Sequence, residues 1–156
     1  MCRTLKDVFK LKLNQLITIC RKYNIALLYL FGSQQKTGLD LLKGEDVSVN
    51  DPLTDIDIGA VFIKELPSPY ERAKLYALVY NDFTDLFLLF RLDLCFLQEN
   101  HSVFQLEAVA RGICIYAVNE IFQEEYEMSI LRRAADFHLY HQVSDEELYW
   151  VLPKVP

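Results

Sequence analysis

Two apolar stretches with polar residues at fixed places constrain the fold of this chain most. The first, Leu28–Ser33, is an apolar run that ends at a glycine and a serine, which is typical of a buried strand followed by a turn. The second, Thr54–Gly59, alternates acids with apolar residues, so a strand there places Asp55 and Asp57 on one face, about 6–7 Å apart. A third acid, Asp93, lies inside another apolar run. Acids in otherwise apolar strands are costly unless they bind something.

The composition indicates one folded domain, residues 1–156. Apolar residues make up 52% of the chain, which is enough for a substantial core, and its length is usual for a single domain. The formal net charge of −6 argues against a broad nucleic-acid surface, because phosphate binding needs a surplus of lysine and arginine. No apolar run approaches the ~18–20 residues of a membrane span. We therefore expect a soluble protein, and the four cysteines, which show no paired spacing, fit the reducing cytoplasm.

Hydrophobic periodicity predicts alternating helices and strands. It places four strands at 25–31, 55–62, 90–96 and 113–117. Thr4 with Asp7 is expected to cap a first helix, and Asn119 a long last helix that reaches about His141. A separate turn or two is expected to start at Ser144. The fold class that follows is α+β, a short mixed sheet of about four strands packed with helices.

The placement of the polar residues suggests a chemistry. Gly32 lets a ligand approach the backbone closely, and Ser33 adds a hydroxyl beside the start of a helix, an arrangement that suits phosphate. Asp55 and Asp57 together suit Mg²⁺, and Asp93 would extend the site to two metal ions. A plainer interpretation treats the Gly-Ser pair as a turn only, with Asp55 capping its strand and Asp57 paired with an arginine.

The order of these motifs resembles that of the polymerase-beta-like nucleotidyltransferase superfamily. The Gly-Ser turn after an apolar strand, the strand with two acids and the later strand with a third acid carry the resemblance. In its small size the chain resembles the minimal nucleotidyltransferase (MNT) branch of this superfamily. The likeness covers about residues 4–141, and it includes Gly112 to Tyr116, which resembles the family's Gly-x-x-x-Tyr strand. A nucleotidyltransferase fold is therefore expected.

The resemblance also implies an activity and a partner. Many similar proteins are antitoxins that adenylylate a tyrosine of a HEPN ribonuclease toxin, so it implies AMP transfer from ATP, with Mg²⁺ as cofactor. Asp55 and Asp57 would bind Mg²⁺, and Asp93 would help to bind metal and accept the proton of the attacking hydroxyl. The residues implied to bind the nucleotide are Gly32, Ser33 and Lys36.

Two other functions stay open at this point. The first is a catalytically weak MNT-fold antitoxin that neutralises its partner by masking it, although masking alone needs none of the three acids. The second is a nucleotidyltransferase for a small hydroxylated molecule, although such enzymes generally carry an additional substrate domain. The sequence leaves the oligomeric state open as well, a homo-oligomer included.

One departure from the family pattern affects the site. The 21 residues between Ser33 and Asp55 are roughly twice the number usual in the family. We expect a short helix and then an insertion, Leu39–Asn50, that caps the nucleotide, contacts a partner or is an inert surface loop. Whether Lys36 and Gly38 take the places of the family's post-motif residues is left open by this spacing.

Overall fold

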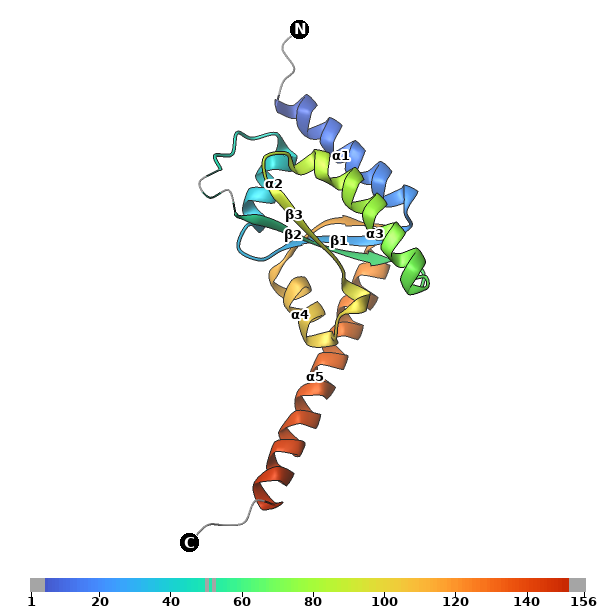
Figure 1. Cartoon of the computed structure of the whole chain (residues 1–156), viewed down its shortest axis with the longest axis vertical. Helices are drawn as coiled ribbons and strands as arrows, with labels where there is room; N and C mark the ends of the chain where they lie inside the picture. Colours follow the sequence, from blue (N-terminus) through green and yellow to red (C-terminus); the bar gives the residue numbers. More distant parts are fainter. Residues whose placement is uncertain (1–4, 50, 52, 152–156) are drawn as a thin grey trace.

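The computed structural model describes the backbone of residues 5–49, 51 and 53–151, and the side chains of 8–49, 51 and 53–139. The expected cap by Thr4 and Asp7 lies outside the described side chains. The elements in chain order are α1 (Leu5–Lys22), β1 (Ile25–Phe31), α2 (Gln35–Lys43), β2 (Asp55–Phe62), α3 (Pro69–Thr84), η1 (Asp85–Phe87), β3 (Arg91–Phe96), η2 (Leu97–Glu99), α4 (Ser102–Arg111), β4 (Ile113–Ala117) and α5 (Glu120–Val151). The predicted α+β class is confirmed (Figure 1).

The four strands form one mixed sheet in the order β3-β2-β1-β4. Strand β1 is apolar throughout and buried along nearly its whole length, as expected for a strand covered on both faces. It pairs antiparallel with β2 and β4, whereas β2 and β3 run parallel because α3 provides the crossover between them. The end of β1 and the starts of β2 and β3 therefore meet at the same edge of the sheet.

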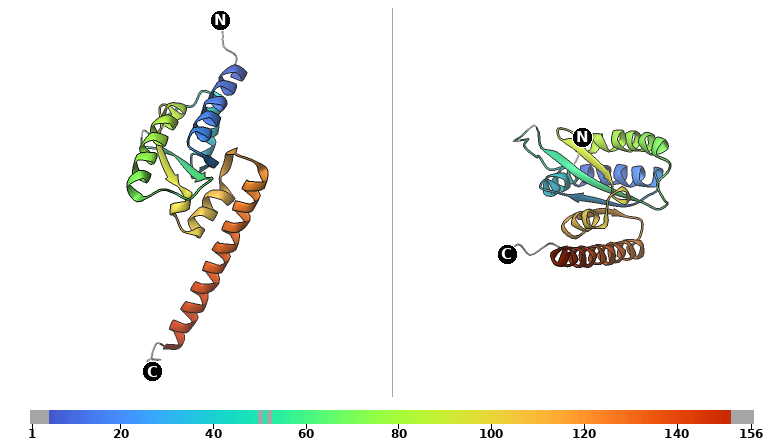
Figure 2. Two further views of the ribbon diagram at one scale, coloured as in Figure 1. Left: turned by 90° about the vertical axis from the view of Figure 1, so that its right-hand side faces the viewer. Right: turned by 60° about the horizontal axis from the view of Figure 1, so that its bottom comes forward.

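Helices cover both faces of the sheet (Figure 2). Helices α1, α2 and α3 lie on one face, and α4 and α5 lie on the other. On the first face the buried helix residues are Leu16, Cys20, Leu41, Leu42, Val79 and Phe83. On the second face Tyr126 of α5 donates a hydrogen bond of 2.6 Å to the buried Gln105 of α4. That bond ties the last helix to the body of the domain.

The expected insertion, Leu39–Asn50, is helical in its first part. Residues 39–43 belong to α2, and Leu41 and Leu42 are buried in the core. The helix ends at Gly44, whose φ of +77° is readily adopted by glycine. Residues 45–49 form neither helix nor strand, and Asn50 lies outside the described residues. The first part of the segment is therefore core structure.

Helix α5 corrects the prediction for the end of the chain. A helix to about His141 followed by separate turns from Ser144 is wrong, because one helix runs from Glu120 to Val151. This stretch contains no glycine or proline, and a serine inside a helix costs only about 0.5 kcal/mol relative to alanine. Figure 1 shows α5 extending well beyond the sheet. No helix among the described residues is long and apolar enough to cross a membrane.

Candidate functional site

Gly32 directly follows β1 and packs against the side-chain carboxylate of Asp57 on β2. Its φ of +75° lies in the left-handed region, which side chains other than glycine rarely adopt. A Cβ at this position would also collide with the side chain of Asp57, with its carboxyl carbon only 3.1 Å away. Register explains the contact, since Phe31, just before Gly32, pairs with Asp57. The turn at Gly32 and strand β2 are therefore packed directly against each other.

Ser33 and the start of α2 follow directly. Ser33 is exposed, and the side chain of Gln34 at the N-cap accepts no hydrogen bond from a backbone N–H of the helix, although its Oε1 accepts one of 2.8 Å from the hydroxyl of Thr37. The first turn carries no acidic residue, so its backbone N–H groups and the positive end of the helix dipole suit an anion. Lys36 lies exposed in that turn. The three residues predicted to bind the nucleotide thus lie on one turn and the helix that it starts.

The three predicted acids share one face of the sheet. Asp57 and Asp93 are register partners on the parallel strands β2 and β3. The backbones of such neighbouring strands lie about 4.8 Å apart. Asp55 lies two residues earlier on the same face, as the pleat predicts. Asp55 and Asp57 are half-buried, whereas Asp93 is exposed. Within the described residues, however, no three His, Cys, Asp or Glu side chains are gathered closely enough to hold a metal ion as they stand.

The electrostatics of these acids favour a cation. Burial raises the pKa of Asp57, and the negative charges of Asp93 and Asp55 raise it further. One carboxylate oxygen of Asp55, Oδ1, is buried and makes no hydrogen bond. Carboxylate oxygens in this condition fit Mg²⁺, a hard cation that combines one or two carboxylates with phosphate oxygens and water. Asp55 and Asp57 could hold the ion, with Asp93 beside them.

Arg91 is a site residue that the sequence analysis missed. Its Nε lies 3.4 Å from Oδ1 of Asp55, an ion pair without the geometry of a hydrogen bond. Both side chains are partly exposed, so solvent weakens the pair. The plainer interpretation of the sequence pairs Asp57 with an arginine, whereas in the structure the arginine pairs with Asp55. A signal was present, because Arg91 precedes Asp93 by two residues just as Asp55 precedes Asp57.

The raised pKa of Asp57 makes a prediction about stability. Since the folded value lies above the unfolded one, this group contributes stability at acid pH that is lost as pH rises through the folded pKa. We expect Asp57→Asn to raise the Tm by roughly 1–3 °C near neutral pH and to have little effect in acid. Differential scanning fluorimetry at both pH values tests this, with the exposed Asp46→Asn as control. An unchanged or lower Tm at neutral pH would contradict it.

The comparisons with known proteins agree with this architecture. The family model described as "Polymerase beta, Nucleotidyltransferase" matches residues 14–121. Among solved structures, a toxin–antitoxin with AMP-PNP is similar at 17% identity and a TM-score of 0.59, covering 88% of this chain and 98% of that one.

Two further structures are similar to the same degree. They are the toxin–antitoxin MntA-HepT and a tri-AMPylated Shewanella oneidensis HEPN toxin in complex with MNT antitoxin. Each has 17% identity and a TM-score of 0.57, with 90% of this chain and 98% of that one covered. At this identity the likeness shows the fold. No curated protein matches the chain. The family match, which spans most of the chain, shows that the protein belongs to the polymerase beta nucleotidyltransferase family.

Proposed function

We propose that this protein is an MNT antitoxin that transfers AMP from ATP to a tyrosine hydroxyl of a cognate HEPN ribonuclease toxin. The observation that carries the proposal is the packing of the Gly32 turn against Asp57, which in turn lies in register with Asp93. Catalysis requires such a unit, and masking a partner does not. The similar structures support the choice, since they are toxin–antitoxin complexes, one with AMP-PNP and one with a tri-AMPylated toxin.

The Gly32 turn and the start of α2 would hold the triphosphate. The left-handed turn at Gly32 leaves no side chain between backbone and ligand, and Ser33 offers a hydroxyl at the same place. The uncapped first turn of α2 offers N–H groups to phosphate oxygens. Lys36 would add a positive charge beside them. These groups bind and orient the β- and γ-phosphates.

The acids would serve the reacting centre. Asp55 and Asp57 would hold Mg²⁺, which neutralises charge on the phosphates when bound. The acceptor hydroxyl attacks the α-phosphorus, the bond from that phosphorus to the oxygen bridging to the β-phosphate breaks, and pyrophosphate leaves. Asp93, exposed at the edge strand β3, is the carboxylate that would take the proton of the hydroxyl. Its exposure leaves room for a protein acceptor.

Two observations favour a second candidate, the masking antitoxin. The acids of the described part of the chain do not form a group that could hold a metal ion, and Arg91 forms an ion pair with Oδ1 of Asp55. If ATP and Mg²⁺ do not displace this arginine, the chain would keep the fold and bind its partner without transferring AMP. An intracellular toxin as partner would place either antitoxin in the cytoplasm.

Label transfer separates the two candidates. The reaction contains α-³²P-ATP, Mg²⁺ and, as acceptor, the product of the gene next to the one for this protein. We expect the wild type to label the acceptor and the double variant Asp55→Ala/Asp57→Ala to leave it unlabelled. Asp136→Asn, which changes an exposed acid of α5 outside the 39–50 segment, should label as well as the wild type. Stable complexes from wild type and double variant without label from either would reject the transferase and leave the masking antitoxin.

A further inference from the structure

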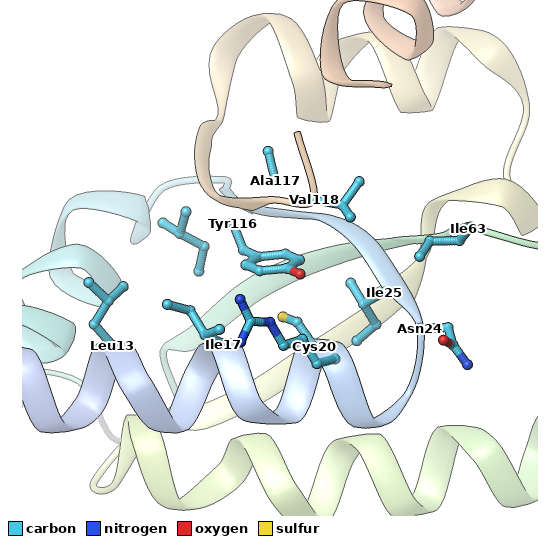
Figure 3. A pocket seen from close by; sticks show the side chains of 11 residues that line it. Leu13, Ile17, Cys20, Asn24, Ile25, Ile63, Tyr116, Ala117 and Val118 are labelled. Carbon is cyan, nitrogen blue, oxygen red and sulfur yellow. The ribbon is translucent and has the colours of Figure 1, made fainter. Parts of the chain in front are cut away.

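A second site lies at the opposite end of β1 from the Gly32 turn. It is an open groove of about 520 Å³ between α1 and the end of β4 (Figure 3). Leu13 and Ile17 of α1 form one wall, and Ile25 and Ile63 lie along the other side. Tyr116 of β4 reaches between them, over Cys20. The volume is in the range of small-molecule sites, and the walls are mostly apolar as in such sites.

Three polar side chains border this apolar groove, and two of them, Arg21 and Asn24, are exposed to solvent. The guanidinium of Arg21, the side-chain amide of Asn24 and the hydroxyl of Tyr116 all belong to residues that line it. None of the three has an ion pair or side-chain hydrogen bond to another described residue, although the backbone carbonyl of Asn24 accepts one from Ile63. A few polar groups around apolar walls are what fixes a ligand in a pocket. Arg21 is the cation among them, so the complementary head group is an anion.

Cys20 does not make the groove reactive. Burial raises the pKa of the Cys20 thiol to about 12, so the thiol stays protonated and unreactive at neutral pH. The sulfur therefore serves as part of the apolar floor. We propose that the groove binds a small amphipathic carboxylate, a molecule with an apolar body and one anionic head. The body lies along Leu13 and Ile17, and the head pairs with Arg21 and accepts a hydrogen bond from Tyr116.

The groove is separate from the proposed nucleotide site. The two lie at opposite ends of β1, a strand of seven residues that spans roughly 20 Å. No acid predicted to bind metal lines the groove, and no groove residue lies on the Gly32 turn. The proposal therefore does not depend on nucleotidyl transfer, and ATP with Mg²⁺ should not displace the carboxylate.

Titration of the full chain with decanoate, followed by amide NMR, tests this assignment. We expect shift changes at residues 115–118 and at the Arg21 side chain. Arg21→Gln should weaken decanoate binding about tenfold, since a charged hydrogen-bonded partner is lost, and leave binding of uncharged decanol unchanged. Arg132→Gln, an exposed arginine on α5, makes the same change in net charge and should bind as the wild type. Ile17→Trp, which fills the groove, should abolish binding of both probes.

Three results would overturn the proposal. Equal decanoate affinity of wild type and Arg21→Gln would remove the anionic head from the argument. Shift changes centred away from residues 115–118 would place the ligand elsewhere. A dimer in light scattering, with the amides of 115–118 protected from hydrogen exchange and no response to decanoate, would assign the groove to a second copy of the chain.

Discussion

Gly32→Ala should reduce AMP transfer by at least about 10²-fold while the chain still folds. The left-handed conformation alone costs an alanine roughly 1–2 kcal/mol, which a domain can tolerate. The larger effect is local, because the new methyl group takes the space of the Asp57 carboxylate and drives it from its place. A displacement of about 1 Å at a reacting centre is enough for the predicted loss. Label transfer and a urea melt, measured on the same preparation, check both parts.

Gly44→Ala is the matched control for this prediction. Gly44 has nearly the same φ, +77° against +75°, but it caps the far end of α2, where a methyl group would meet Val8. It should therefore cost comparable stability and leave transfer intact. In a double-mutant cycle, Gly32→Ala should cost less stability in the Asp57→Ala background than in the wild type. Additive costs would show that the two residues do not share the space, and would contradict the argument.

The parts of the fold that the sequence predicts correctly depend on short-range patterns. The run 25–31 is apolar enough to indicate a central strand, and the alternation from Asp55 indicates one face for two acids. Both predictions are confirmed because they need only the geometry of a single strand. The continuity of α5 was missed because a serine near its end was given too much weight, although its helix cost is small.

The missing parts of the site depend on strand pairing. That Asp57 lies beside Asp93, and Asp55 beside Arg91, follows from the register of β2 and β3, which are separated in the chain by α3. A shift of one residue would turn the acids of one strand to the other face, and the local pattern does not say which register forms. The groove beside Tyr116 likewise needs α1 and β4, which lie at opposite ends of the sequence, to be placed together.

The acids of the proposed site oppose folding near neutral pH. Asp57 is half-buried beside two like charges, and its raised pKa is a cost to the folded protein near neutral pH. The ion pair of Asp55 with Arg91 offsets little of this cost, because both side chains are partly exposed. A bound cation would remove the repulsion, so Mg²⁺ together with ATP should stabilise the wild type more than Asp57→Asn. Acids placed in this way are typical of a working site.

Asp93→Asn should lower the rate of AMP transfer by roughly 10²–10⁴-fold, the usual contribution of a positioned general base. The amide keeps the shape of the side chain but cannot accept the proton. Because Asp93 is exposed while Asp55 and Asp57 are half-buried, we expect AMP-PNP affinity with Mg²⁺ to change by less than about tenfold. Single-turnover label transfer and calorimetric AMP-PNP binding separate the two quantities, with Asp136→Asn, an exposed acid of α5, as the control. If transfer survives in Asp93→Asn, the proton goes elsewhere; if nucleotide binding is lost with it, Asp93 acts chiefly as a metal ligand.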